Sequence, residues 1–451
     1  MAASSREPDL HERRFRLDTQ NQTTCCVVGG GPAGMFTGYL LARAGVQVTV
    51  LEKHKDFNRD FRGDTVHPST LQVFHELGLL HDLLKIPHTK ITSAGGFFGD
   101  FPFTMADFSH LPVHCKFIAL MPQWDLLKFL AARAREFPTF SLEMEHEATN
   151  VISNGGRVKG VSVKTPTGEK TIVADLIVGC DGRRSTIRRA AGLEVIETGV
   201  PIDVLWFSIS RNQDDAEQLL GRLNYGKALI LINRGDYFQA GMIIKKDSFE
   251  QIKQEGLSKF RESVSRIAPF LAERVEELHD WDQVKLLTVK INHLSKWYRP
   301  GLLCIGDSAH AMSPAGGVGI NYAIQDAIAA ARILAPALRD RRPTDHLLPQ
   351  VQRRRELPVR FIQVLQKQAH LGFAKIFDNP GPLQAPIALK LVMRIPGRQQ
   401  LMGRLLGLGL RPEHVRETQP ERPNRLLIAA ACGVGTALAF LAGCTLLKRA
   451  R

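Results

Sequence analysis

Residues 23–53 contain the feature that most constrains the fold of this chain. An apolar run is followed by a glycine-rich turn, an Ala- and Leu-rich stretch and a second apolar run that ends in an acid. This order predicts a strand, a turn, a helix and a parallel strand. The turn places Gly29, Gly31 and Gly34 in the pattern G-x-G-x-x-G, in which the glycines permit a sharp bend, backbone approach to a diphosphate, and close packing of helix on sheet. The pattern predicts a dinucleotide site; the alternative is a tight turn without a ligand.

The residues around this turn extend the predicted site. Pro32 and Ala33 open the helix, whose first N–H groups and positive dipole end would face the phosphates. Glu52 stands at the end of the second strand, where its carboxylate can accept hydrogen bonds from an adenosine ribose. Its neighbour Lys53 completes the predicted contacts.

The composition is that of an ordinary globular chain of 451 residues, 44% hydrophobic and 23% charged, which suffices for two or three cores. The formal net charge of +14 does not by itself indicate nucleic acid, because no basic array interleaved with aromatic residues accompanies it. We therefore expect no nucleic-acid partner. The seven cysteines show no C-x-x-C spacing, which indicates a reducing compartment and argues against a zinc site; we expect no metal.

The two ends of the chain differ in character. Residues 1–22 are charged and lack an apolar core, so we expect a disordered leader rather than a signal peptide. Residues 426–447 are uncharged, mostly apolar and long enough to cross a bilayer, and basic residues flank them. We expect a transmembrane helix that anchors the protein to membrane lipid, with the rest of the chain on the cytoplasmic side. The alternative is a buried terminal helix in a soluble cytoplasmic protein.

Apolar periodicity along the remaining chain predicts an α/β fold with discontinuous domains. Residues 91–120 and 201–291, rich in short strand-like runs, are expected to form an inserted, mostly antiparallel second domain. Residues 346–425 are Arg-rich and helical in pattern, and we expect them to form a basic C-terminal region. The dinucleotide-binding domain, a Rossmann-like parallel sheet with a β-meander, is predicted to comprise residues 23–90, 121–200 and 292–345.

Two acids follow apolar, strand-like runs at positions where open parallel sheets bind ligands. Asp181 and Gly182 form a turn that can offer backbone amides to a diphosphate; a DG β-turn without a ligand is the alternative. Asp307 follows a second run, and an acid at the carboxyl end of such a strand points into the ligand crevice. Its carboxylate suits hydrogen bonding to a polyol chain.

A further glycine-rich segment, residues 314–321, opens a long Ala-rich helix. Glycines at a helix start expose its unpaired N–H groups and the positive end of its dipole. The negative charge on the pyrimidine edge of a reduced flavin would be stabilised at such a position. A helix N-cap without a ligand is the alternative.

Five motifs occur in this chain in one order: G-G-G-P-A-G…E, R-G…P-x-x-L, Q-x-x-L, D-G-x-x-S-x-x-R and G-D-x-x-H-x-x-x-P-x-x-G-x-G-x-N-x-x-x-x-D. In this set and order the chain resembles the para-hydroxybenzoate hydroxylase-type, or group A, FAD monooxygenases, which include the ubiquinone-biosynthesis hydroxylases. The resemblance spans residues 23–338. One departure is visible after the DG pair, where Arg183, Arg184 and Ser185 stand in place of smaller or Asn-containing residues.

The resemblance implies roles for individual residues. Arg62 would approach the FAD phosphates and ribityl region, and Gln123 would contact the flavin. Asp181 and Gly182 would serve both FAD and NAD(P)H, and Asp307 would bind the ribityl chain. The residues implied to hold the ADP half of FAD are Gly29, Gly31, Gly34 and Glu52. The residues implied to line the isoalloxazine ring are Pro314, Gly317, Val318, Gly319 and Asn321.

The resemblance also implies a reaction: NAD(P)H reduces tightly bound FAD, the flavin reacts with dioxygen to a C4a-hydroperoxide, and one oxygen atom passes to an aromatic or lipophilic substrate. The second domain would be a substrate domain that keeps water out of the pocket. No catalytic residue can be assigned, and we expect His310 to be structural. The alternatives are an isoprenoid-type flavin reductase, a halogenase-like oxidoreductase, although its W-x-W-x-I-P motif is absent, and a non-catalytic FAD-fold binding protein.

Overall fold

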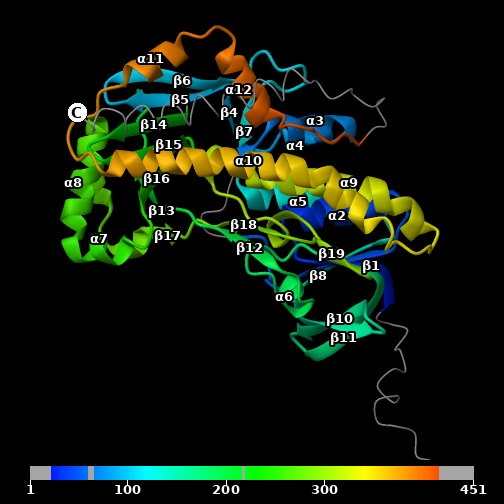
Figure 1. Ribbon diagram of the computed structural model, residues 1–451. Helices are drawn as coiled ribbons and strands as arrows, with labels where there is room; N and C mark the ends of the chain where they lie inside the picture. Colours follow the sequence, from blue (N-terminus) through cyan, green and yellow to red (C-terminus); the bar gives the residue numbers. More distant parts are fainter. Residues whose placement is uncertain (1–21, 59–64, 216–218, 416–451) are drawn as a thin grey trace, which may run out of the picture.

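The computed structural model describes residues 22–58, 65–215 and 219–415 (Figure 1). The predictions for the leader at residues 1–21, for Arg62 and for the span at residues 426–447 therefore lie outside the described residues. Within them the predicted α/β fold is confirmed: a mainly parallel sheet covered by helices is accompanied by a second, mainly antiparallel sheet. The exact domain boundaries stay a prediction.

The central sheet has eight strands, and its path runs β19-β20-β11-β1-β2-β8, with β10 pairing to β11 and β9 to β10. The pairs from β20 to β8 are parallel, and Cys25 of β1 lies opposite Val48 of β2 and Leu176 of β11. The strands are β1 (Gln22–Val28), β2 (Val48–Glu52), β8 (Phe140–Met144), β9 (Glu147–Asn154), β10 (Arg157–Thr165), β11 (Gly168–Gly179), β19 (Tyr298–Arg299) and β20 (Leu302–Cys304).

Three helices cover one face of this sheet: α2 (Pro32–Arg43), α5 (Gln123–Ala134) and α9 (Gly319–Arg339). Alternate residues of β1 belong to two different cores. Cys25 packs in the core with the helices, whereas Cys26 packs in the core formed with β10 and β11. This alternation explains the continuous apolar run, because a strand covered on both faces has no polar side. The parallel strands therefore end together at one edge, where α2 begins.

The second sheet has seven described strands in the order β17-β13-β16-β15-β14-β5-β6, in which β14 and β5 pair in parallel and the other pairs are antiparallel. α7 (Phe249–Glu255) and α8 (Leu257–Ile267) cover one face. Phe373 and Phe377 pack on the other face. The strands are β5 (Ser93–Phe98), β6 (Phe101–Asp107), β13 (Ile202–Ser210), β14 (Leu219–Asn224), β15 (Lys227–Asn233), β16 (Tyr237–Lys245) and β17 (Lys285–Leu287).

Short elements complete the described part of the chain. A three-stranded sheet and a two-stranded sheet accompany three short helices and five single 3-10 turns. They are β3 (Thr65–Val66), α3 (Pro68–Glu76), α4 (Leu80–Leu83), β4 (Thr89–Ile91), β7 (Ile118–Leu120), α6 (Thr186–Ala190), β12 (Val195–Thr198), η2 (Pro269–Leu271), η3 (Val275–Glu277), η4 (Trp281–Gln283), β18 (Ile291–Leu294), η5 (Gly306–Ser308) and η6 (Ala315–Gly317).

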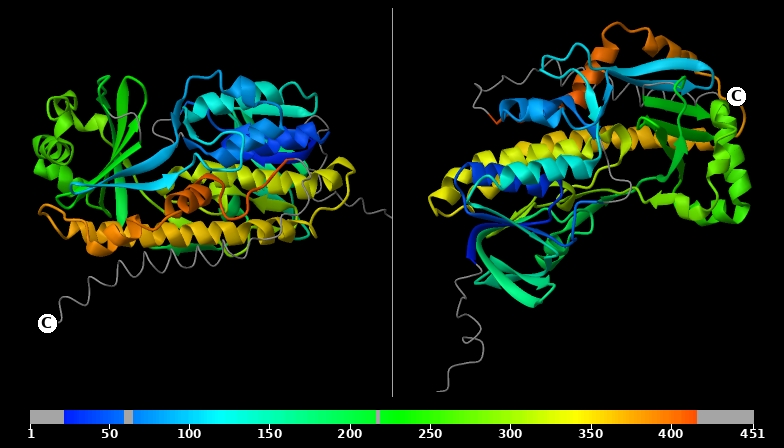
Figure 2. Two further views of the ribbon diagram at one scale, coloured as in Figure 1. Left: turned by 90° about the horizontal axis from the view of Figure 1, so that it is seen from above. Right: turned by 180° about the vertical axis from the view of Figure 1, so that it is seen from behind.

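The long helix α10 (Leu348–Phe377) runs along α9 and continues to strands β13 and β15 of the second sheet (Figure 2). It therefore ties the two sheets together. α11 (Ile387–Met393) and α12 (Arg398–Gly407) follow it. α12 packs directly on β6, where a Cβ on Gly403 would lie 1.8 Å from the Asp107 carbonyl oxygen.

The expectation of a membrane-anchored protein is corrected by the structure. From residue 22 to residue 415, leaving out 59–64 and 216–218, no helix combines the length and the apolar character that a membrane span needs. The long helices α9 and α10 carry charged residues along their length, and α12 packs on the second sheet. A membrane-lipid partner is likewise not supported.

Candidate functional site

The glycine turn after β1 is shaped by close contacts within the protein. Gly29 has a positive φ of 106°, and a Cβ there would lie 2.5 Å from the carbonyl oxygen of Cys180. A Cβ on Gly34 would lie 1.8 Å from the Gly29 carbonyl oxygen. These two glycines therefore let β1, the end of β11 and the first turn of α2 approach one another.

Gly31 serves a different purpose, because a Cβ there would meet no protein atom within 4 Å. It precedes Pro32 and Ala33 as the N-cap residue of α2, in an extended conformation. The open space lies at the N-terminus of a 12-residue helix, where unpaired N–H groups and the helix dipole favour an anion. A phosphate group fits this position.

Glu52 lies at the end of β2 and faces the glycine turn. Its Oε2 accepts a hydrogen bond of 3.0 Å from the Gly30 N–H, and its Oε1 accepts one of 3.1 Å from the His54 N–H. The carboxylate is 7% exposed and fixed beside the turn, where it can also accept from ribose hydroxyls. The Lys53 side chain is exposed and lies 3.9 Å from Glu147 on the surface. Its predicted contact with the cofactor stays a prediction.

The DG turn follows β11, and its aspartate holds the turn together. Asp181 accepts hydrogen bonds from the Ser185 hydroxyl at 2.5 Å and from the Ile187 N–H at 3.0 Å. Gly182 has a φ of 80°, and a Cβ there would meet no protein atom within 4 Å. Asp181 therefore shapes the turn, and the Gly182 backbone borders open space.

The GD turn follows β20 and packs against the start of α2. Gly306 has a φ of 61°, and a Cβ there would lie 3.0 Å from the Ala33 Cβ. The next residue, Asp307, is about one-third exposed and accepts a hydrogen bond of 3.0 Å from Arg183 Nε. The structure thus brings the glycine, DG and GD turns together at one edge of the central sheet.

Asn321, whose place beside the flavin ring stays a prediction, connects segments of the protein. Its side-chain oxygen accepts hydrogen bonds from the His67 N–H at 2.9 Å and from the Thr70 hydroxyl at 2.7 Å. Its side-chain nitrogen donates to the carbonyls of Thr65 at 3.1 Å and Gly317 at 3.2 Å. Both ends of the amide are satisfied, so Asn321 positions the start of α9 against β3 and α3.

The remaining residues of the 314–321 segment differ in surroundings. Gly317 has a φ of 61° and lies against Thr65, whose hydroxyl donates to its carbonyl at 2.7 Å. Val318 is buried, whereas a Cβ on Gly319 would meet no protein atom within 4 Å. Like Gly31 and Gly182, Gly319 is therefore a site glycine beside open space. Pro314 precedes η6.

Gln123 begins α5 and is partly buried. Arg62, predicted near the phosphates, is outside the described residues. Three glycines beside open space, two of them at helix N-termini, together with the strand-end acids Glu52 and Asp307, form a cradle that fits the extended shape and the diphosphate of FAD.

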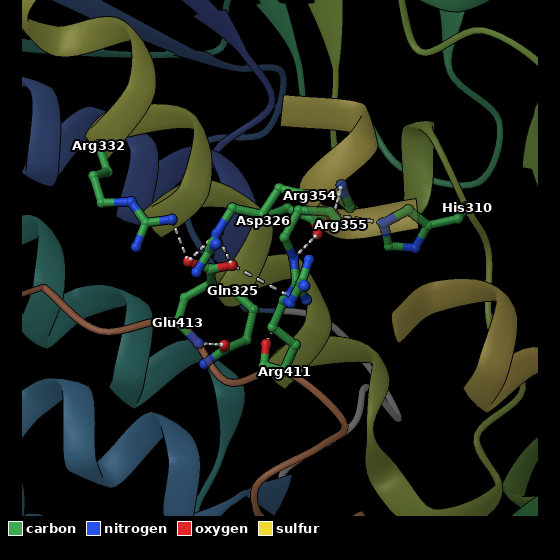
Figure 3. A network of polar contacts seen from close by, with 9 residues as sticks. His310, Gln325, Asp326, Arg332, Arg354, Arg355, Arg411 and Glu413 are labelled. Carbon is green, nitrogen blue, oxygen red and sulfur yellow. Dashed lines mark hydrogen bonds and ion pairs between the residues drawn. The ribbon is translucent and has the colours of Figure 1, made fainter. Parts of the chain in front are cut away.

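A buried ion-pair network, not assigned a role from the sequence, lies behind the GD turn (Figure 3). Asp326, the last residue of the longest motif, accepts hydrogen bonds through Oδ2 from the Gly306 N–H at 3.0 Å and from His310 Nε2 at 2.5 Å. Its Oδ1 accepts from Arg355 Nε at 2.9 Å. His310 is buried beside Trp297, so the prediction of a structural histidine agrees with this geometry.

The network continues to the last described segment of the chain. The Glu413 carboxylate is completely buried and contacts three arginines: Arg354 at 2.7 Å, Arg332 at 2.8 Å and Arg355 at 3.6 Å. Its backbone N–H donates to Gln325 of α9. Three guanidinium groups around one carboxylate fix this segment to α9 and α10.

Two strand residues of the second sheet lie on the face opposite α7 and α8. Trp206 lies opposite Gly241 and Ser208 opposite Gln239, so Trp206 and Gln239 share a face. Trp206 is 9% exposed, and its Nε1 has no hydrogen-bond partner in the part of the chain that the structure describes. Gln239 accepts hydrogen bonds from Arg234 at 2.7 and 3.1 Å.

Comparison with known proteins adds to this geometry. The sequence matches the family described as FAD binding domain over residues 22–364. It is similar to 6-methylpretetramide 4-monooxygenase of Streptomyces rimosus, with 30% identity over 399 residues, which cover 85% of this chain and 92% of that protein. It is also similar to an uncharacterized aromatic compound monooxygenase of Bacillus subtilis (strain 168), with 26% identity over 337 residues, which cover 70% of this chain and 62% of that protein.

Among solved structures, the fold is similar to that of OxyS anhydrotetracycline hydroxylase from Streptomyces rimosus. The TM-score is 0.70 at 21% identity, and the match covers 89% of this chain and 78% of that chain. At this level of identity the likeness concerns the fold.

Proposed function

This chain belongs to the FAD binding domain family and is an FAD-dependent monooxygenase, and from this premise we propose that it hydroxylates an aromatic compound with electrons from NAD(P)H and one atom of dioxygen. The observation that carries the proposal is the convergence of the glycine, DG and GD turns at the edge of a parallel sheet, with open space beside Gly31 and Gly182.

We place FAD along this edge. Gly31 and the N-terminus of α2 would hold the diphosphate, and Glu52 would accept hydrogen bonds from the adenosine ribose. Asp307 would bind the ribityl chain. Gly319 would lie beside the ring system, where the first N–H groups of α9 would stabilise negative charge on the pyrimidine edge. When bound, FAD supplies the chemistry by which one oxygen atom of dioxygen enters the substrate and the other leaves as water.

The residues of the chain position the reactants and exclude water. The Asp326 carboxylate accepts a hydrogen bond from the Gly306 N–H, and this bond fixes the turn that carries Asp307. Asn321 fixes the start of α9 against α3. α10 runs from α9 to the second sheet (Figure 2), and we propose that the two cover the substrate, because a dry site protects reactive oxygen species from water.

We propose an aromatic, predominantly apolar substrate that lies against the face of the second sheet that carries Trp206 and Gln239. An indole face provides apolar contact area for a ring, and its buried N–H has no hydrogen-bond partner among the described residues. The Bacillus subtilis relative is an aromatic compound monooxygenase according to its name, which supports this class.

The test is reduction of the purified holoprotein by NADH or NADPH without oxygen, with and without a panel of phenols and polycyclic aromatic compounds. We expect a substrate that accelerates flavin bleaching and, with labelled dioxygen, gains one labelled oxygen atom. Bleaching without incorporation of the label would contradict hydroxylation and favour the flavin-reductase alternative. A protein that binds no FAD would contradict the whole proposal.

A further inference from the structure

Arg183 occupies the junction between the DG turn and the GD turn, and it is the first of the three residues at which the chain departs from the expected pattern. Its Nε donates to Asp307 Oδ2 at 3.0 Å, and one terminal nitrogen donates to the Met312 carbonyl at 3.4 Å. The Arg183 and Asp307 side chains are each 32% exposed. The guanidinium is therefore neither buried in the core nor extended into solvent.

The backbone of Arg183 is fixed on both sides of the junction. The Arg183 carbonyl accepts a hydrogen bond from the guanidinium of Arg188, which is 9% exposed. Arg188 also donates to the Ser308 carbonyl of the GD turn at 3.2 Å. Arg188 thus joins the two turns from behind. The direction in which the Arg183 side chain leaves the turn is set by the fold.

The charges at this junction are unfavourable for a diphosphate unless a cation is present. Asp181 and Asp307 carry negative charge at the ends of neighbouring strands, and Gly306 of the GD turn contacts Ala33 in the first turn of α2. A dianionic diphosphate near these carboxylates would be repelled by them in a partly desolvated setting, where like charges repel strongly. Arg183 is the cation that pairs with Asp307 there.

We propose that Arg183 binds the diphosphate of a dinucleotide in this site, an inference that rests on the proposed function. Its second terminal nitrogen has no hydrogen-bond partner among the described residues, and its neighbour Gly182 borders open space. The pair with Asp307 holds the guanidinium in place. The edge of the guanidinium that carries the second terminal nitrogen can then bind phosphate oxygens, which a planar guanidinium binds through parallel hydrogen bonds. Asp307 keeps its other oxygen for the ligand.

Both FAD and NAD(P)H contain a diphosphate, so the experiment has two arms. In the first, the dissociation constant of FAD is measured from the fluorescence of released flavin for the wild type, Arg183→Gln, Arg183→Lys and Arg189→Gln. Arg189 is exposed on α6, so Arg189→Gln changes the net charge equally without touching the junction. In the second, flavin-saturated proteins are reduced without oxygen at increasing NAD(P)H, and the half-saturating concentration is measured.

We expect Arg183→Gln to weaken binding of one dinucleotide by about 10- to 100-fold, because a charge-assisted hydrogen bond to a phosphate is lost. The affinity of Arg183→Lys should lie between those of Arg183→Gln and the wild type, and the affinity of Arg189→Gln should match the wild type. Weaker FAD binding assigns Arg183 to FAD, and a higher half-saturating NAD(P)H concentration alone assigns it to the reductant. The inference is overturned if both constants stay within twofold in both Arg183 variants. If the wild type binds no FAD, the proposed function itself fails.

Discussion

Arg355 and Asp326 form an ion pair whose two side chains are almost completely buried: Arg355 Nε donates to Asp326 Oδ1 at 2.9 Å, and the side chains are 2% and 0% exposed. Burial alone would raise the pKa of Asp326, but the neighbouring His310 and Arg355 together lower it, so the carboxylate is charged. The pair joins α10 to the turn that carries Asp307. Its energetic contribution can be measured directly.

Asp326→Asn should destabilise the protein, because it leaves a buried arginine without its closest carboxylate. We expect the free energy of unfolding to fall by about 3 kcal/mol, the typical cost of removing one partner of a buried pair. Urea unfolding of the apoprotein measures this value without interference from FAD. Asp340→Asn, which removes a carboxylate paired with arginines on the exposed surface, is the matched control and should cause no measurable change. Equal effects of the two substitutions would contradict this assignment.

Gly34→Ala and Gly31→Ala should separate the structural glycine from the ligand-binding glycine. The methyl group at Gly34 would lie 1.8 Å from the Gly29 carbonyl oxygen, so we expect a loss of about 3 kcal/mol in apoprotein stability. At Gly31 the methyl group meets no protein atom within 4 Å, so apoprotein stability should be unchanged while FAD affinity falls. Chemical unfolding and FAD titration of both variants provide the measurements. Unchanged FAD affinity in Gly31→Ala would show that the diphosphate lies elsewhere.

The buried histidine His370 should make the protein less stable in mild acid. Burial lowers the pKa of His370 from 6.5 to about 4, and its Nε2 lies 2.8 Å from the Ser313 hydroxyl. Between these values the unfolded chain binds a proton that the folded chain does not, so stability falls as the pH drops from about 6.5 to 4 and is unaffected above that window. The expected contribution is about 3 kcal/mol at pH 4.

His370→Gln tests this directly, because glutamine keeps a polar partner for Ser313 but does not titrate. Unfolding free energies at pH 8 should be similar for the two proteins, and the wild type should lose more stability on acidification. His67, whose pKa burial likewise lowers to about 4, remains in both proteins and gives both a residual slope. Parallel pH profiles would show that His370 is not buried in its neutral form.

Local patterns in the sequence identified the turns of the site but not the purpose of each residue. Gly29, Gly31 and Gly34 were all recognisable from spacing, yet only the packing of β11 and α2 separates the two structural glycines from Gly31. For Asp181 and Asn321, the structure adds hydrogen bonds from their side chains to protein groups, which the motifs do not predict. A motif shows which residue types a site needs, whereas the role of each atom follows from its contacts in the structure.

The long-range contacts of Glu413 behind the site could not be predicted from local patterns in the sequence. Glu413 lies 88 positions beyond Gln325, to whose side chain its N–H donates, and an isolated glutamate in an Arg-rich region predicts only a solvated surface. Its complete burial depends on three arginines from α9 and α10, which helical periodicity alone does not bring to one point. The membrane expectation came from the composition of residues 426–447, which lie outside the described residues, and no helix of the described part is long and apolar enough to span a membrane.

Glu413→Gln and Asp326→Asn should act non-additively, because both carboxylates contact Arg355. Each single substitution leaves Arg355 with one anionic neighbour. The double substitution removes both carboxylates and leaves the buried guanidinium without an anionic partner among them. We therefore expect the double variant to lose about 1 kcal/mol more than the sum of the single losses in unfolding free energy. A cycle of four urea titrations on the apoprotein measures this coupling, and a second cycle with Asp340→Asn in place of Asp326→Asn should give none. Additive losses in the first cycle would mean that Arg355 does not connect the two carboxylates energetically, and that the Glu413 carboxylate is held by Arg332 and Arg354.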